Sequence, residues 1–99
     1  MKTYNPVGTE AYFDTTHHGL IPGVTRGWET DSFRLEGGGV IESGSKSLLI
    51  RITKDVGPYR KGETIKSTAN WIVPREAVRK PSKGEYYPRI GPYRWEGAS

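Results

Sequence analysis

Residues 47–53 read Ser-Leu-Leu-Ile-Arg-Ile-Thr, and this stretch decides the fold class. Three apolar residues, Leu48, Ile50 and Ile52, alternate within it with residues of mixed character. Because successive side chains of a β-strand point to opposite faces, this alternation predicts a strand with one buried face. It is the clearest strand signal in the 99-residue chain.

Helices are almost excluded elsewhere by glycine and proline. The 13 glycines and seven prolines are spread along the chain, and the longest stretch without either runs from Ser45 to Val56. Since both residues weaken helix interiors, we expect only one helical turn, over Pro74–Arg79, with proline at its first position. The remaining apolar segments predict further short strands, at 11–15, 21–28, 33–35, 40–41, 63–66 and 71–73. Five to seven short strands are typical of a barrel or sandwich.

Two of these strands carry glycine or proline. Pro22 and Gly23 predict a bulge or an edge position at the start of strand 21–28, after which Val24, Arg26 and Trp28 are expected to share a face. The triple glycine at 37–39 lacks the lysine and the following helix of a phosphate-binding loop, so it predicts a hairpin or a bulge.

The composition indicates a folded domain with a small core. Hydrophobic residues make up 33% of the chain, yet 11% of residues are aromatic and the net charge is only +4. Disordered chains are usually aromatic-poor and highly charged. We expect an N-terminal arm at 1–7, a folded domain at 8–80 and a basic, aromatic C-terminal tail at 81–99, with Trp71 in the core.

The segment from Leu48 to Val78 resembles small β-barrels of the Src-homology-3-like class. Tyr59-Arg60-Lys61-Gly62-Glu63-Thr64-Ile65 has the aromatic-x-x-Gly-acidic-x-hydrophobic turn of that class, and 73–78 reads Val-Pro-Arg-Glu-Ala-Val, as in its closing strand and helical turn. The Gly-Pro-Tyr-Arg-Lys-Gly-Glu turn also resembles small proteins of tailed bacteriophages. The resemblance implies an all-β, Src-homology-3-like barrel of five to seven short strands, one helical turn and extended termini.

Enzymatic and metal chemistry are not expected. The chain has no cysteine, and its two histidines, His17 and His18, would point to opposite faces of a strand, with only Asp14 nearby as a further ligand. Glu29 and Asp31 could share a face, but they flank a polar turn, which favours an ordinary charged loop over acid–base catalysis. We therefore expect no enzyme activity, no metal and no cofactor.

The charge is divided unevenly along the chain. Residues 1–45 hold three Lys or Arg against six acids, whereas residues 46–99 hold twelve against five. Aromatic residues are interleaved with the cations of the second half. Cations that neutralise phosphates beside aromatics that stack on bases are typical of nucleic-acid binding, although tyrosine, tryptophan and arginine also mark protein interfaces.

The sequence thus favours a non-enzymatic binding module whose basic, aromatic-rich half engages an acidic partner, most simply nucleic acid. The alternative is a structural or interaction protein, such as a phage virion component or a small factor that docks on a host or viral protein. No membrane span or signal peptide is evident, so the cytoplasm is expected, or the virion under the alternative. The expected partner-binding residues are Tyr59, Arg60, Lys61, Arg75, Arg79, Lys80, Lys83, Tyr86, Tyr87, Arg89, Tyr93, Arg94 and Trp95.

Overall fold

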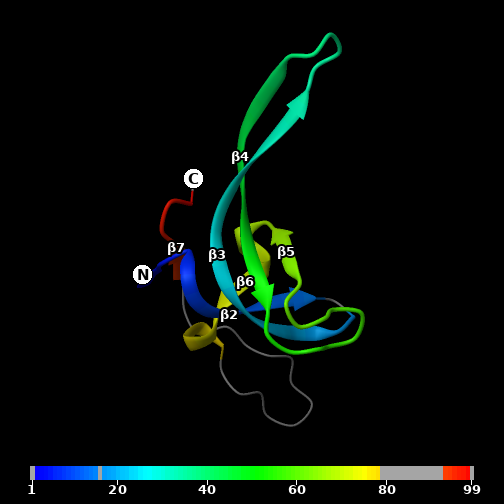
Figure 1. Ribbon diagram of the computed structural model, residues 1–99. Helices are drawn as coiled ribbons and strands as arrows, with labels where there is room; N and C mark the ends of the chain where they lie inside the picture. Colours follow the sequence, from blue (N-terminus) through cyan, green and yellow to red (C-terminus); the bar gives the residue numbers. More distant parts are fainter. Residues whose placement is uncertain (1, 16, 79–92, 99) are drawn as a thin grey trace.

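The computed structural model describes residues 2–15, 17–78 and 93–98, and these residues form strands joined by turns (Figure 1). They contain no α-helix, which confirms the all-β prediction. The elements are β1 (Lys2–Tyr4), β2 (Val7–Thr15), β3 (Gly19–Arg34), β4 (Val40–Ile52), β5 (Thr64–Ser67), the 3-10 turn η1 (Ala69–Trp71), β6 (Ile72–Pro74), the 3-10 turn η2 (Arg75–Ala77) and β7 (Tyr93–Trp95).

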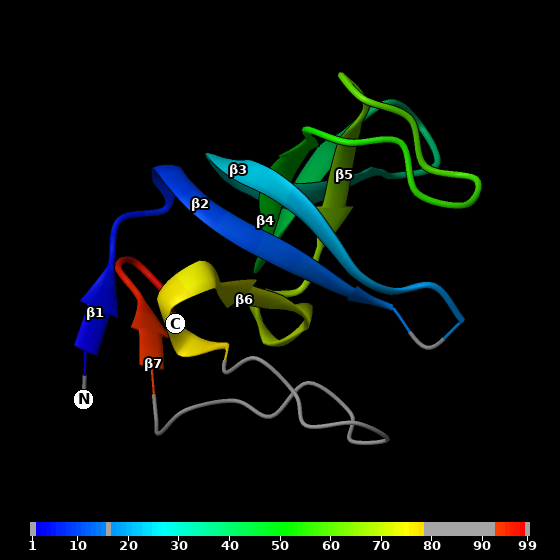
Figure 2. The same cartoon turned by 90° about the horizontal axis from the view of Figure 1, so that it is seen from below.

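Five of the strands form one antiparallel sheet in the order β5-β4-β3-β2-β6. The sheet curls strongly, because β2 and the first half of β3 turn away from the direction of β4 (Figure 2). In the described part of the chain, β5 and β6 each pair on one side only, so the sheet is open and the expected closed barrel is not formed. The helical turn expected over Pro74–Arg79 is present as the shorter 3-10 turn η2, with Pro74 directly before the turn instead of at its first position.

The core is built on residues 47–53, the stretch that predicted the fold class. Leu48, Ile50 and Ile52 are fully buried, while Arg51 is exposed, which confirms the predicted alternation. The strand itself is longer than the expected seven residues, since β4 begins at Val40.

A β-bulge changes which side chains of β3 reach this core. Thr25 pairs with Ile50 and Gly27 pairs with the next β4 residue, so Arg26 is an extra residue in β3. An extra residue reverses the alternation of every side chain beyond it. Trp28 therefore lies opposite buried Leu48, on the core side, whereas Val24 pairs with exposed Arg51 on the other. The prediction that 24, 26 and 28 share a face is wrong for this reason.

Pro22 lies just beyond the end of the β3–β4 ladder, where β3 is paired as a strand with β2 alone, so the expected edge position is found. It is opposite Tyr12 of β2, and its carbonyl accepts a hydrogen bond from the Thr53 N–H at 3.0 Å. The nitrogen of Pro22 faces the same way as this carbonyl, toward the place where the β3–β4 ladder ends at Gly23 and Ile52. A missing N–H at the end of a ladder interrupts no pairing, so proline is tolerated there.

Both terminal segments join the core, and together we call 2–4 and 93–98 the terminal seam. β1 and β7 pair in parallel, and the ring centroids of Tyr4 and Trp95 are 5.9 Å apart. Trp95 is only 2% exposed, and its Nε1–H donates to the Ile72 carbonyl at 2.9 Å. The expected domain boundaries lie between residues 7 and 8 and between residues 80 and 81. They separate the terminal seam from the sheet, although the two share one core.

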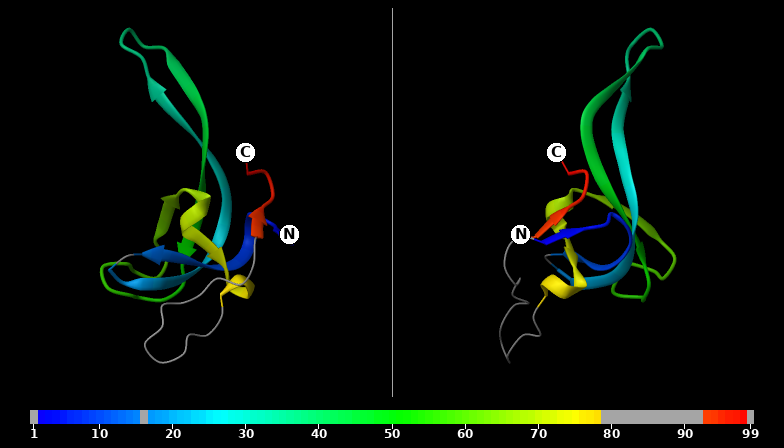
Figure 3. Two further views of the ribbon diagram at one scale, coloured as in Figure 1. Left: turned by 180° about the vertical axis from the view of Figure 1, so that it is seen from behind. Right: turned by 90° about the vertical axis from the view of Figure 1, so that its left-hand side faces the viewer.

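The far halves of β3 and β4 project from the rest of the molecule as a two-stranded ribbon (Figures 1 and 3). We call residues 29–46 the hairpin arm. The β2–β3 pairing starts at Arg26, and the β4–β5 pairing ends at Leu48, so neither neighbour follows the strands into the arm. The triple glycine forms its tip, where Gly37 and Gly38 have φ of 97° and 102°, which confirms the predicted hairpin.

Candidate binding pocket and basic loop

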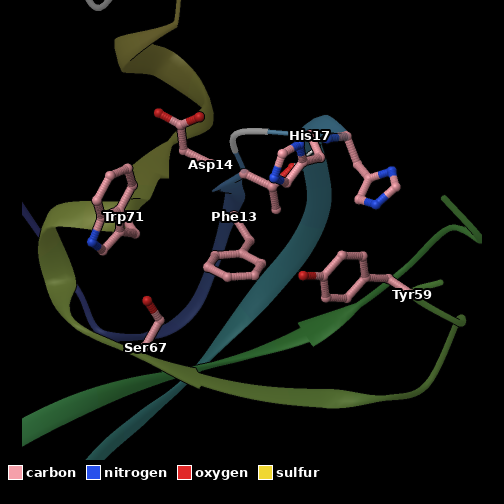
Figure 4. A pocket seen from close by; sticks show the side chains of 8 residues that line it. Phe13, Asp14, His17, Tyr59, Ser67 and Trp71 are labelled. Carbon is pink, nitrogen blue, oxygen red and sulfur yellow. Dashed lines mark hydrogen bonds between the residues drawn. The ribbon is translucent and has the colours of Figure 1, made fainter. Parts of the chain in front are cut away.

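One open pocket of about 370 Å³ brings together three aromatic side chains from separate segments of the chain (Figure 4). It lies where the end of β2 meets the loop between β4 and β5, the end of β5 and η1. Its lining residues are Phe13, Asp14, Thr15, His17, His18, Tyr59, Ser67 and Trp71. Figure 4 shows Trp71 and Tyr59 on opposite sides, with Phe13 between them.

Tyr59 is held in place by its own loop and by two rings. Val56 and Tyr59 exchange two backbone hydrogen bonds of 2.9 Å, which close a tight turn around Gly57. The Tyr59 ring meets Phe13 edge to face at 5.8 Å and His18 at 6.0 Å. Gly57 has φ of 55°, and a Cβ there would lie 2.7 Å from His18 Nδ1, so any other residue would strain the backbone and displace the His18 ring.

Trp71 forms the opposite wall and was expected in the core. It is 50% exposed, because η1 turns its side chain outward just before the buried residues Ile72 and Val73. The correction has a simple cause, since the single turn of 3-10 helix breaks the strand that was predicted over 71–73. An indole face is therefore accessible beside a hollow that already contains two other rings.

The loop that carries Tyr59 also carries cations, and we call 53–63 the basic loop. Lys54, Arg60 and Lys61 are exposed. Its two carboxylates are engaged by the loop backbone, since Asp55 accepts the Lys61 N–H at 2.7 Å and Glu63 accepts the Arg60 N–H at 2.9 Å. No ion pair joins the three cations to an acid of the described residues. The loop therefore presents positive charge directly beside the pocket.

The other described residues of the predicted site lie elsewhere. Arg75 forms an ion pair with Glu10 at 2.8 Å, and this hydrogen bond raises the pKa of Arg75 above its usual value. Tyr93 is half-buried in β7, and the Arg94 guanidinium donates to the Ala98 carbonyl at 3.1 Å. Trp95 cannot contact a partner while it is buried, which corrects its place among the expected partner-binding residues.

The structure thus brings together Tyr59, Arg60 and Lys61 out of the predicted set. Six predicted residues fall outside the described part of the chain, namely Arg79, Lys80, Lys83, Tyr86, Tyr87 and Arg89. Sequence reasoning missed Phe13 and His18 as partners of Tyr59. No pattern relates positions so far apart in the chain, and only the strand order reveals their contact.

The rejected chemical sites can also be located. Residues 2–15, 17–78 and 93–98 contain no group of three side chains suited to hold a metal ion, and the backbone N–H of His18 is bonded to Thr15 Oγ1 at 3.0 Å. Glu29 is exposed at the base of the hairpin arm, while the Asp31 side chain lies outside the described part.

Within the described residues, no helix is long and apolar enough to cross a bilayer. No protein-family model, curated protein sequence or solved structure matches this chain.

Proposed function

We propose that this protein is a non-enzymatic module that binds single-stranded nucleic acid. An unstacked base enters the pocket against Trp71, and the neighbouring phosphates lie along the basic loop. One observation carries the proposal: a half-exposed indole faces an aromatic hollow, and the same loop that supplies Tyr59 to this hollow supplies three exposed cations.

The energetics of single-strand binding match this arrangement. Base–aromatic stacking contributes about 1–3 kcal/mol per base, and it is available only to a base that has left a duplex stack. Cations next to the stacking rings gain from counterion release as they neutralise phosphates. Trp71 and Tyr59 can supply the first term, and Lys54, Arg60 and Lys61 the second.

We propose further that the curled sheet is a partly open Src-homology-3-like barrel. The support comes from three placements along the chain. The Tyr59–Glu63 turn leads into β5, Val73 and Pro74 close the last strand of the sheet, and η2 follows at once as a single turn. In such a barrel the pocket and the basic loop would lie together at one end.

Fluorescence anisotropy with labelled single strands and duplexes, at low and near-physiological salt, tests the proposed function. We expect the wild-type protein to prefer single strands and its affinity to fall steeply with salt. Trp71→Ala should lose about 1–3 kcal/mol of binding free energy with an unchanged salt slope, whereas Trp71→Phe, which keeps a ring, should lose less. The triple variant Lys54→Ala/Arg60→Ala/Lys61→Ala should flatten the salt slope.

Far-ultraviolet circular dichroism of each variant confirms that the sheet is intact, since Trp71 and the loop cations lie outside the core. Absence of binding at low salt would refute the proposal. Binding that is equally strong in wild type and in Trp71→Ala would place the site elsewhere and refute the assigned pocket.

A further inference from the structure

Asp14 is a buried carboxylate in the wall of the aromatic pocket, and it is only 8% exposed. The β2–β6 register pairs Phe13 with Ile72. Asp14 and Trp71 are the next residues along these two antiparallel segments, so they lie beside each other. Figure 4 shows the Asp14 carboxylate on the Trp71 side of the pocket, away from Tyr59. A base that stacks on the indole can therefore present an edge to this carboxylate.

The polar groups that line the pocket are mainly acceptors. The hydroxyl groups of Thr15 and Ser67 donate their hydrogens to backbone carbonyls, at 2.8 and 3.3 Å. The imidazoles of His17 and His18 can donate, but both residues are exposed. An ionised carboxylate only accepts. The buried polar part of the pocket beside the indole therefore fits a ligand edge that carries donors.

Guanine is the one standard base with two adjacent donors on the same edge. Its N1–H and its N2 amino group can meet the two oxygens of one carboxylate as a bidentate pair. On the corresponding edge, adenine and cytosine place an acceptor nitrogen next to the amino group, and thymine or uracil has a single N–H between two carbonyls. An acceptor held against a carboxylate oxygen loses its water and gains no hydrogen bond. A buried carboxylate beside a stacking ring thus favours guanine.

We propose that Asp14 makes the pocket selective for guanine, with the base stacked on Trp71 and its N1–H and N2 amino group donating to the carboxylate. This inference rests on the proposed single-strand function and names the base that the pocket accepts. Asp14 already interacts with another group of the protein. A carboxylate accepts at about four lone-pair positions, so that interaction and a bidentate contact with a base are compatible. Tyr59 and the basic loop lie on the other side of the pocket, so the phosphates stay with the cations.

Fluorescence anisotropy with labelled thymidine decamers tests the proposal on the wild-type protein. The strands are uniform or carry one central guanine, adenine or inosine. We expect the guanine strand to bind about 5- to 150-fold more tightly than the adenine strand, as for one bidentate base contact. Inosine keeps N1–H but lacks the N2 amino group, so its strand should have an intermediate affinity.

The variant Asp14→Asn tests the carboxylate itself. Its amide presents one acceptor and one donor group, which match the amino group and ring nitrogen of adenine, so the preference for guanine over adenine should be lost. Asp55→Asn is the matched control. It removes the same charge outside the pocket and keeps the oxygen that accepts the Lys61 N–H, so it should retain the preference. Should Asp14→Asn fail to fold by circular dichroism, the inosine strand tests the same contact in the wild-type protein.

The outcomes separate this inference from the proposed function. Equal affinity for the guanine, adenine and inosine strands, with binding that still depends on Trp71, would overturn guanine selection and leave the proposed function intact. Failure of every strand to bind at low salt would overturn both. An unchanged guanine preference in Asp14→Asn would overturn the role of Asp14. Guanosine monophosphate should compete weakly, since it brings one phosphate to the basic loop, and competition as strong as that of the strand would assign the pocket to a free nucleotide instead.

Discussion

The same four letters, Gly-Pro-Tyr-Arg, occur at 57–60 and at 91–94, and the structure gives their tyrosines and arginines opposite roles. In the basic loop, Tyr59 lines an open pocket and Arg60 is exposed beside it. In the terminal seam, Tyr93 packs against the core and Arg94 bonds to the backbone of Ala98. Identical short sequences therefore supply a candidate binding surface in one region and a structural strand in the other.

The neighbours of each string explain the difference. Tyr59 follows a left-handed glycine in a tight turn, so its ring is presented by a loop against Phe13 and His18. Tyr93 is two residues before Trp95, so the two side chains lie on the same face of β7. The Tyr93 ring therefore points toward the core, as the buried indole of Trp95 does. A single anchoring side chain, rather than the string itself, decides which copy is structural.

Removing that anchor should have the largest effect. Trp95→Ala is expected to destabilise the fold by about 3–5 kcal/mol, because it opens a cavity in the core and leaves the Ile72 carbonyl without its donor. Urea unfolding followed by circular dichroism measures this loss. The matched variant Trp71→Ala should change stability far less, and equal losses for the two variants would remove the distinction between seam and pocket.

The two tyrosines should separate binding from stability. Tyr59→Ala is expected to weaken single-strand binding by about 1–3 kcal/mol, since it removes one wall of the pocket. Tyr93→Ala should lower the urea midpoint instead, because its ring packs against the core cluster. Anisotropy titration and urea unfolding of both variants provide the comparison. Loss of affinity in Tyr93→Ala without loss of stability would contradict it.

The sequence predicted the parts of the fold that depend on local alternation. Ile50 and Ile52 are buried as expected, and the proline at 74 ends a strand and precedes a single turn. It did not predict the bulge at Arg26, because a bulge is defined by two strands and leaves no period in either one. The long ribbon was missed for a related reason, since pairing of β3 with β4 overrides the weak strand propensity of a glycine-containing segment.

Prediction of the site was limited by the same ambiguity. A basic stretch rich in tyrosine and tryptophan indicates a surface or a core equally well, and the chain uses it for both. Trp95 was expected to bind the partner and is buried, whereas Trp71 was expected in the core and is half-exposed. Burial depends on contacts with segments distant in sequence, such as β1 against β7, and composition does not contain this information.

The two arginines of the repeated string should differ in the salt dependence of binding. Arg60→Ala is expected to reduce the slope of log affinity against log salt by about 1, as for the loss of one phosphate contact. Arg94→Ala should leave the slope unchanged, because its guanidinium is engaged by Ala98 in the seam. Titrations over a series of salt concentrations measure both slopes. Equal slope changes would show that the seam also contacts phosphate.

The smallest effect concerns an ion pair that ties the seam to η2. Lys2 donates a hydrogen bond to the Glu76 carboxylate, and this bond, with the charge of Lys2, lowers the pKa of Glu76 below 4.5. The same contact raises the pKa of Lys2 above 10.5. A lowered carboxyl pKa in the folded state stabilises the fold above the unfolded-state value and loses that contribution as pH falls through the folded-state pKa. The lysine contribution is lost at the other end, as pH rises through its raised pKa.

Both groups are solvent-exposed, so the pair contributes little to stability, but its pH dependence is specific to the seam. Glu76→Gln should lower the urea midpoint slightly at neutral pH and match the wild type in acid, where the wild-type carboxylate is protonated. Glu96→Gln removes an exposed carboxylate of the seam that forms no ion pair among the described residues, so it should shift the midpoint less. A constant difference between Glu76→Gln and wild type at all pH values would show that the ion pair does not hold β1 against η2.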